Sequence, residues 1–485
     1  MTAGGRSGGG TVQEPLAALA AAAGEARAEV WLVGGVVRDR LLGRATLDID
    51  AVVTGDPAML ARAVGRRAAG HAFELSEAFG GWRVAARDRS WQLDLLALVG
   101  AGVEGDLARR DLTLNAIAEP LLAGGELGSA IDPFGGVADL RAGRLRMVSE
   151  RSFREDPLRV LRLARFAAQL GFTAEPVTLA RARESAAELT AVAGERIFAE
   201  LRGVVCAPGA LTGLQLMDEL GAMRAVLPEL DALHGVEQSR YHHLDVSGHT
   251  RATLAETIAL VEEPARLVAD EHTAHALGDA LAQPLANELT RGQALRFGAL
   301  LHDVAKARTR AVSEEGRVSF WGHDELGAEM SREILGRLRA SDRLQSYVAA
   351  LTRSHLRLGF LVHSAPLSRR GLYDYLMACA PVAVDVTLLS VADRLATRGA
   401  NAGPAIDAHL RLAAEVMPAA LAFEAEPPRP PLRGDELAEA LGITPGPRLG
   451  ELLAELQAAA YAGEISGREQ ALQLARDLLE ESDRP

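Results

Sequence analysis

Two aspartates separated by one residue are the first feature of this sequence with a chemical meaning. Asp48 and Asp50 lie in the segment LVGGVVRDRLLGRATLDID, where Gly34, Gly35 and Arg38 precede them. Residues i and i+2 of a strand point to the same face, so both carboxylates should face one spot. Paired carboxylate oxygens suit Mg²⁺ that also holds substrate phosphates. Two such ions could activate an attacking hydroxyl and stabilise a leaving pyrophosphate.

The residues around this pair add to the candidate site. Gly34 and Gly35 would let the backbone approach a triphosphate, aided by a helix N-terminus. Asp94, in the segment QLDL, is a candidate third carboxylate, and a plain strand residue is an equal alternative. An isolated D-x-D is typical of an exposed acidic strand, whereas the order G-G-x-x-R-D, L-G, D-x-D is far more restrictive.

A second candidate site consists of histidines and aspartates in the C-terminal half. The adjacent pair HD lies in the apolar segment ALLHDVAKA, with one histidine before it and one aspartate after it: His249, His302, Asp303 and Asp393. Imidazole with carboxylate suits a divalent transition metal or Mg²⁺ that activates water. His323 and His355 could bind a second metal or contact phosphate, and Lys306 could neutralise phosphate charge.

The surrounding pattern predicts the elements that position these residues. Strands are expected over 30–35, 47–53 and 91–98, with a helix over 56–69, which indicates an α+β domain. From Phe153 onward the pattern is helical. The expected segments are a flexible leader (1–24), the α+β domain (25–150), two helical blocks (151–235 and 236–410), a Pro-rich linker (411–434) and a helical tail (435–485).

Composition limits the function classes. The net charge of −13 argues against indiscriminate binding to nucleic acid backbones but allows a local basic surface. Cys206 and Cys379 cannot form a disulfide framework in 485 residues, which suits a reducing, cytoplasmic compartment. No stretch approaches the ~20 apolar residues of a membrane helix, so no membrane partner is expected. Neither the charge nor the composition indicates an oligomeric state.

Three further segments narrow the family: RRDLTLNAIA (109–118), IDPFGGVADL (131–140) and FREDPLRVLRLARFAAQLGF (153–172). The aspartate segment resembles the nucleotidyltransferase motif of the DNA polymerase β superfamily. All four together resemble the class II CCA-adding enzymes and bacterial poly(A) polymerases, most closely the bacterial CCA-adding enzymes with an HD domain. The resemblance runs from about residue 28 to 410 and continues more weakly into the tail. It implies a polymerase β-like head with a mixed sheet, an all-α neck and body, and an all-α HD domain.

The segment 153–172 has a physical logic of its own. Asp156 can cap a helix with Pro157 in its first turn, and Gly171 can end it. Glu155, Asp156, Arg159 and Arg162 would then lie within about 120° of one another on that helix. A carboxylate beside a guanidinium can satisfy the Watson–Crick edge of a base. The alternative is a surface ladder of ion pairs.

The resemblance assigns roles to these residues. It implies that Asp156 and Arg159 read the base, that Glu155 orients the arginine, and that the protein itself is the template. It also implies that three residues of the second segment contact ribose and phosphate: Arg110, Asp111 and Asn115.

The expected function is addition of C, C and A to tRNA 3′ ends from CTP and ATP, with Mg²⁺ in the head. The expected HD activity is phosphatase and 2′,3′-cyclic phosphodiesterase action on RNA ends or nucleotides, with a divalent metal of unspecified identity; a scaffold role is the alternative. The short segment 95–105 lacks the family's charged loop, so a CC-adding enzyme is an alternative function. A poly(A) polymerase is a further alternative. A further alternative is an HD phosphohydrolase whose head binds ligands without catalysing a reaction. The residues expected of an active head argue against it, because all of them are present: Asp48, Asp50, Arg110 and Asp156.

Overall fold

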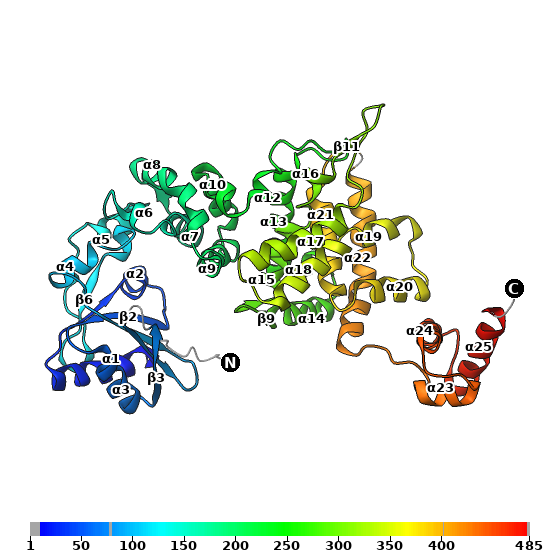
Figure 1. Cartoon of the computed structure of the whole chain (residues 1–485), viewed down its shortest axis with the longest axis horizontal. Coiled ribbons are helices and arrows are strands. Elements are labelled where there is room, and N and C mark those ends of the chain that lie inside the picture. The colour runs from blue at the N-terminus through cyan, green and yellow to red at the C-terminus, as the bar shows by residue number, and fades with distance from the viewer. Residues whose placement is uncertain (1–9, 77–79, 401, 483–485) are drawn as a thin grey trace. The chain divides into compact units, whose positions relative to one another are not determined.

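The computed structural model describes residues 10–76, 80–400 and 402–482. It contains two compact units (Figure 1). One comprises residues up to 192 together with 200–225, and the other comprises 193–199 together with residues from 226 onward. In the described part, no single helix is long and apolar enough to cross a membrane; two consecutive helices, 369–379 and 383–396, meet that test only jointly, across a 95° bend.

A six-stranded mixed sheet forms the centre of the first unit. Its strand order is β3-β4-β5-β2-β1-β6, and only the neighbours β2 and β5 run parallel within it. The strands are β1 (Val30–Val33), β2 (Asp48–Val53), β3 (Gly70–Ser76), β4 (Gly81–Ala86), β5 (Gln92–Ala97) and β6 (Ala118–Pro120). The three predicted strands are confirmed as β1, β2 and β5, and the mixed sheet with helices confirms the α+β fold class. Strands β3 and β4 were not predicted.

Residues 10–26 correct the expected flexible leader. They form helix α1 (Gly10–Ala26), and its residues Leu16, Leu19, Ala22 and Ala23 are buried. These apolar residues recur at the spacing of one helix face, so burying them stabilises the helix against the rest of the unit. Residues 1–9 of the expected leader lie outside the described residues.

A separate short helix precedes the predicted base-selecting helix. Helix α6 (Ser152–Glu155) ends before Asp156, and α7 (Arg159–Leu170) begins three residues later. Asp156 is extended, with φ −148° and ψ 101°, because a residue that precedes proline disfavours the helical region. Gly171 ends α7 in the left-handed conformation (φ 71°), as expected.

Other helices complete the first unit and its connection to the second. They are α2 (Gly35–Leu41), α3 (Pro57–Arg67), α4 (Gly102–Leu107), the 3₁₀ turns η1 (Thr113–Asn115) and η2 (Ala123–Gly125), α5 (Gly136–Ala142), α8 (Pro176–Ser185), η3 (Ala186–Ala191), α9 (Gly194–Val205), α10 (Ala210–Leu220), α11 (Ala222–Val226) and α12 (Pro228–Asp231). A short ladder pairs β7 (Arg144–Leu145) with β8 (Thr173–Ala174).

Helices α15 (Arg291–Leu301) and α21 (Ala383–Ala396) form the core of the second unit and are buried along most of their length. Helix α13 (Val246–Glu262) packs against both. The surrounding elements are η4 (Pro264–Arg266), α14 (Glu271–Ala282), β9 (Pro284–Ala286), β10 (Leu289–Thr290), α16 (Lys306–Thr309), β11 (Ala311–Val312), β12 (Val318–Ser319), α17 (His323–Arg337), α18 (Asp342–Ser354), α19 (Arg357–Leu361), η5 (Val362–Ser364), α20 (Arg369–Cys379) and α22 (Ala402–Ala425).

The expected Pro-rich linker is shorter than predicted. Helix α22 continues to Ala425, so residues 411–425 are helical and only 426–433 connect to the tail. The reason is the buried apolar face of this segment, which includes Leu412, Val416 and Phe423. The tail contains α23 (Gly434–Leu441), α24 (Pro447–Ala462) and α25 (Gly467–Ser482), which share a small apolar core.

Candidate nucleotidyl-transfer and metal sites

The register of β2 and β5 brings the three candidate carboxylates together. Asp48 lies opposite Gln92, and Asp50 lies opposite Asp94. Oδ1 of Asp48 accepts a hydrogen bond of 2.6 Å from the Gln92 amide. Burial and the negative charge of Asp94 raise the pKa of Asp50. Ionised carboxylates crowded in this way repel one another, and a divalent cation would relieve that repulsion, so the donor set fits a hard metal ion.

Arg83 is a charged neighbour that the sequence reasoning missed. It lies opposite Asp94 on β4 and donates two hydrogen bonds of 2.7 Å to the Asp94 carboxylate. Asp94 would therefore have to release at least one of these bonds to bind a metal, whereas no arginine is hydrogen-bonded to Asp48 or Asp50 among the described residues. The antiparallel pairing of β4 with β5 is the signal that would have identified Arg83.

Gly34 brings the backbone close to these carboxylates. Its φ of 73° favours glycine, and a Cβ atom there would lie 2.8 Å from Nη1 of Arg110 and 3.8 Å from Oδ2 of Asp50. Gly35 begins α2, where a Cβ would lie 3.7 Å from Arg38, an ordinary contact. Arg110 is held by Asp106, whose Oδ2 accepts from Nη2 at 3.1 Å. The glycine thus leaves room for Arg110 beside Asp50.

A chain of hydrogen bonds links the head to helix α7. Arg38 donates to Oδ1 of Asn115 at 3.0 Å, and the Asn115 amide donates to Oδ1 of Asp111 at 3.0 Å. Arg162 on α7 donates to Oδ2 of Asp111 at 2.7 Å. Burial alone would raise the pKa of Asp111, but Arg162 and these hydrogen bonds outweigh it and lower the pKa to about 2.

This series of hydrogen bonds involves two of the residues that were predicted to contact the nucleotide. Asp111 and Asn115 are 5% and 4% exposed, and their polar atoms bond within the protein. The arrangement supports a positioning role for both, while contact with ribose or phosphate stays a prediction. Arg38 and Arg162 also lie over the Phe166 ring, at 5.2 and 5.5 Å from its centroid.

The predicted base-reading residues lie at the junction of α6 and α7. Arg159 donates to the backbone oxygens of Ser152 (3.0 Å) and Arg109 (2.5 Å). Glu155 lies 3.7 Å from Arg159 and is about half exposed, so the two form a loose ion pair. Oδ1 of Asp156 accepts from the backbone N–H of Leu158 at 3.2 Å. These side chains are near one another, and base reading remains a prediction.

The IDPFGGVADL segment has a structural explanation. Asp132 accepts hydrogen bonds from the backbone N–H groups of Gly136 (2.6 Å) and Val137 (2.9 Å). A Cβ at Gly136 would lie 2.1 Å from the backbone oxygen of Thr113, the first residue of η1. This close approach fixes the turn that carries Asn115.

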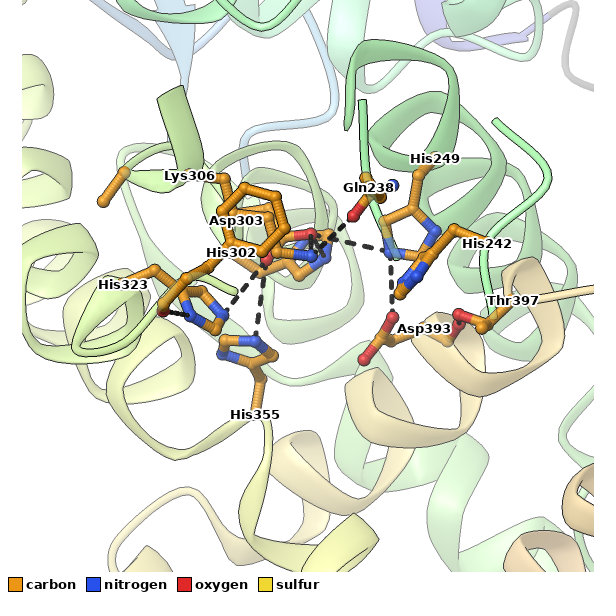
Figure 2. A network of polar contacts seen from close by, with 12 residues as sticks. Gln238, His242, His249, His302, Asp303, Lys306, His323, His355, Asp393 and Thr397 are labelled. Atoms are coloured by element: carbon orange, nitrogen blue, oxygen red, sulfur yellow. Dashed lines mark hydrogen bonds and ion pairs between the residues drawn. The ribbon is translucent and has the colours of Figure 1, made fainter. Parts of the chain in front are cut away.

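The second unit brings the predicted histidines and aspartates together from separate elements (Figure 2). Two groups have ligand atoms within 4.8 Å of one another: His249 with His302 and Asp393, and Asp303 with His323 and His355. His249 lies on α13, Asp393 on α21, and the pair His302–Asp303 directly follows α15. The sequence neighbours His302 and Asp303 therefore belong to different groups.

Backbone carbonyls orient three of these imidazoles. The Nδ1 atoms of His302, His323 and His355 donate to the carbonyl three residues earlier, at 2.8, 2.7 and 2.6 Å. Their Nε2 atoms consequently face Asp303, at 3.1, 3.4 and 3.8 Å from its carboxylate oxygens. A hydrogen bond of this kind to the far nitrogen is how proteins fix a metal-binding imidazole.

Several buried polar atoms of this cluster form no well-aligned hydrogen bond among the described residues, although Asp303 lies within ion-pair distance of Lys306, and His249 within that of Asp393. They are Nε2 of His302 and His323, both ring nitrogens of His249, and both carboxylate oxygens of Asp303. Buried polar atoms without partners are costly, and a divalent cation would satisfy nitrogen and oxygen donors at once. The donor set therefore fits one or more divalent metals, which would supply an activated water.

The electrostatics of the cluster agree with that chemistry. Burial, with the neighbouring His302, lowers the pKa of His355 to about 4, so its ring is neutral at pH 7. Burial alone would lower the pKa of His302, but Asp303 outweighs burial and raises it. Lys306 lies 2.7 Å from Oδ2 of Asp303. His242, which the sequence reasoning missed, lies 5.1 Å from His249 between ring centroids and has its pKa lowered to about 4, first by burial and then by Lys306.

Comparison with known proteins identifies the class to which this fold and these sites belong. Residues 30–98 and 97–146 match the poly(A) polymerase head domain, and 171–233 match the probable RNA- and SrmB-binding site of polymerase A. Residues 271–398 match the HD domain. The chain belongs to the tRNA nucleotidyltransferase/poly(A) polymerase family and carries an HD domain.

Two of the relatives extend over nearly the whole chain, and a third extends over about two thirds of it. The A-adding tRNA nucleotidyltransferase of Deinococcus radiodurans is 37% identical and covers 93% of this chain and 96% of its own length. The CC-adding tRNA nucleotidyltransferase of Thermus thermophilus is 34% identical over 91% of this chain and 92% of its own. A multifunctional CCA protein of Halorhodospira halophila is 37% identical over 68% of this chain and 74% of its own length.

Solved structures share the fold at lower sequence identity. A CCA-adding enzyme in complex with ATP has a TM-score of 0.63 at 21% identity, covering 96% of this chain and 94% of that one. The Thermotoga maritima CCA-adding enzyme complexed with tRNA has a TM-score of 0.59 at 20% identity, covering 96% and 95%.

Proposed function

We propose that this chain adds C, C and A to the 3′ ends of tRNA, using CTP and ATP and releasing pyrophosphate. The observation that carries the proposal is the carboxylate group on β2 and β5. Asp48, Asp50 and Asp94 share one face beside Gly34, and the pKa of Asp50 is raised as expected of a crowded acidic site. Relatives named for addition to tRNA, which span more than nine-tenths of the chain, support the substrate class.

The proposed reaction uses these residues directly. Asp48 and Asp50 would hold Mg²⁺, which would bind the triphosphate and lower the charge repulsion of the acids. The tRNA 3′-hydroxyl loses its proton to solvent water, its oxygen bonds to the α-phosphorus, and the bond from that phosphorus to the α–β bridging oxygen breaks to release pyrophosphate. Arg110, next to Gly34, would contact the triphosphate. Asp156 and Arg159 would select the base, with Glu155 orienting Arg159.

A narrower activity is the second candidate. Relatives that match nearly the whole chain carry the names A-adding and CC-adding, and the segment between β5 and α4 is short. An enzyme that adds only part of the CCA end would need a partner enzyme for the remainder.

For the second unit we propose a metal-dependent phosphohydrolase. The buried, unsatisfied donors of the histidine–aspartate cluster support a divalent metal held by His249, His302, Asp303 and Asp393. His323 and His355 would complete a second ligand group. The proposed functional division is a transferase head (25–150), a neck and body (151–235), an HD domain (236–410) and a helical tail (435–485). Cys206 and Cys379 form no disulfide, which supports a reducing, cytoplasmic compartment.

The test uses tRNA transcripts that end before CCA, after C and after CC. Each is incubated with the full chain, Mg²⁺ and labelled CTP, ATP or both, and the products are sized to one nucleotide. Addition that stops at CCA on all three would establish complete synthesis. Addition of A only to the third transcript would make the chain an A-adding enzyme, a halt at CC would make it a CC-adding enzyme, and a long A tract would indicate a poly(A) polymerase.

A further inference from the structure

A row of side chains crosses four neighbouring strands of the sheet in the first unit. In the strand register, Phe73 on β3 lies opposite Arg83 on β4. Arg83 lies opposite Asp94 on β5, which in turn lies opposite Asp50 on β2. Side chains that lie directly opposite one another on paired strands share one face of a sheet. Because neighbouring strands are ~4.8 Å apart, the Phe73 backbone lies about 10 Å from that of Asp94, and the ring is on the face of the candidate metal ligands.

Two aromatic rings are exposed at the end of this row. Phe73 is 39% exposed, and His71 is exposed as well. Their ring centroids lie 5.9 Å apart with 30° between the ring planes, so the two rings form a stacked pair. Helix α3 covers the other face of β3, where a Cβ at Gly65 would lie 3.5 Å from the Cβ of Ala72. The stacked pair therefore belongs to the face that carries the carboxylates.

Packing within the first unit does not explain why Phe73 is exposed. Burying an aromatic ring stabilises a fold, and an apolar residue exposed on an edge strand invites pairing with another chain. Strand β3 is such an edge, because β4 is its only partner among the described residues. A ligand that contacts the ring is a reason for leaving it exposed.

The side chain between the rings and the carboxylates is positively charged. Arg83 is 29% exposed and donates two hydrogen bonds to Asp94. If Asp94 releases one of them to bind a metal, an Arg83 N–H becomes free for a phosphate. The row thus presents a ring, a guanidinium and carboxylates in that order. A single RNA strand has the matching groups, because its bases stack on aromatic rings and its phosphates bind guanidinium groups.

We propose that the His71–Phe73 ring pair binds a base of the acceptor RNA close to its 3′ end. The base would stack on Phe73, a phosphate of the same strand would contact Arg83, and the 3′-hydroxyl would lie at the carboxylates. The proposal rests on the nucleotidyl transfer proposed above, and it adds residues that position the acceptor strand. The incoming nucleotide is separate, since its base is assigned to the junction of α6 and α7. Stacking tolerates any base, so the pair would hold the strand without reading its sequence.

Steady-state kinetics with the full chain, Mg²⁺ and the tRNA transcript that the wild type extends test the proposal. Phe73→Ala should raise KM for the RNA roughly tenfold, the middle of the range for a lost base–aromatic stack, and leave KM for the nucleotide unchanged. Phe73→Tyr keeps a ring and should retain the wild-type values. Phe73→Leu keeps only the apolar character and should resemble Phe73→Ala; wild-type values in Phe73→Leu would overturn stacking. Met59→Ala, on α3 and 47% exposed, is the control and should change neither KM.

Acceptors that lack one base identify what the ring contacts. Transcripts with an abasic ribose at each of the last three positions are compared in the wild type and in Phe73→Ala. At one position, loss of the base should raise KM in the wild type and have no further effect in Phe73→Ala, because both changes remove the same contact. Effects that add in full at all three positions would overturn the proposal.

Equilibrium binding separates this proposal from nucleotidyl transfer. The Kd of the end-labelled transcript is measured without CTP or ATP, so that no chemistry is needed. A roughly tenfold weaker Kd in Phe73→Ala that Phe73→Tyr restores supports the ring contact even if the wild type adds no nucleotide, an outcome that would refute only the transferase. An unchanged Kd in Phe73→Ala, or no binding by the wild type, would overturn the proposal. Sedimentation tests the other occupant: a wild-type dimer that Phe73→Ala dissociates, with an unchanged Kd for RNA, would assign the ring to a second copy of the chain.

Discussion

Asp111→Asn should destabilise the first unit in a pH-dependent way. Asp111 is 5% exposed, and its carboxylate bonds to Arg162, Asn115 and the Leu112 N–H. Its pKa falls from 3.8 to about 2 on folding, which corresponds to about 2 kcal/mol of stability at 1.36 kcal/mol per pKa unit. The amide cannot pair with the Arg162 charge, so we expect the variant to lose at least about that amount at pH 7.

The pH dependence follows from the direction of the pKa shift. A lowered carboxyl pKa stabilises the fold fully above the unfolded value of 3.8, and the stability is lost as the pH falls through about 2. About half of the contribution should remain at pH 3. The difference in unfolding free energy between wild type and Asp111→Asn should therefore be larger at pH 7 than at pH 3.

Urea denaturation followed by tryptophan fluorescence measures this difference. A multidomain chain does not unfold in one step, so the probe must report one unit. In a Trp321→Phe background the remaining tryptophans, Trp31, Trp82 and Trp91, all lie in the first unit. Asp88→Asn is the control, because Asp88 is exposed and bonds only locally to Ser90. Equal stability of wild type and Asp111→Asn at pH 7, or an equal difference at both pH values, would refute the reasoning.

Three other substitutions test separate parts of the structure. Arg159→Ala should reduce discrimination between CTP and UTP at least several-fold while leaving metal binding intact; unchanged discrimination in a competition assay would contradict base reading. His302→Ala should abolish phosphate ester hydrolysis and spare nucleotide addition, and parallel loss of both in a folded protein would contradict two separate sites. Gly136→Ala should lower the unfolding free energy by about 1–3 kcal/mol, because its Cβ would collide with the Thr113 carbonyl oxygen. Gly24→Ala in α1, which would meet no described atom within 4 Å, should be neutral or stabilising in the same melt.

The sequence predicted those strands and helices in which the spacing of apolar residues matches the residues that are buried. Strands β1, β2 and β5 have mostly buried apolar residues at regular positions, so their type and place were readable. Strand β3 was missed because its residues are mostly exposed, including Phe73 and Leu75. Helix α1 was missed since the glycine-rich start concealed the apolar spacing of the residues that follow.

The sequence predicted most of the residues of the candidate sites, but few of the contacts that those residues make. The spacing of Asp48 and Asp50 placed both on one strand, and the register then added Asp94. Spacing could not reveal that Arg83 pairs with Asp94, because that contact depends on a strand the pattern did not indicate. Nor could it reveal that Asp111 is enclosed by Arg162, which is 51 residues away.

Pyrophosphate release is the most direct measurement of the central claim, that Asp48 and Asp50 catalyse nucleotidyl transfer. The full chain is incubated with Mg²⁺, CTP and a tRNA transcript that lacks CCA, with a transcript ending in CC and ATP as a parallel reaction. The account predicts release by the wild type and a loss of at least about a hundredfold in Asp48→Ala, since one catalytic metal ligand is removed. His302→Ala should retain the wild-type rate. Release that Asp48→Ala leaves unaffected, or no release by the wild type with either transcript, would contradict the account.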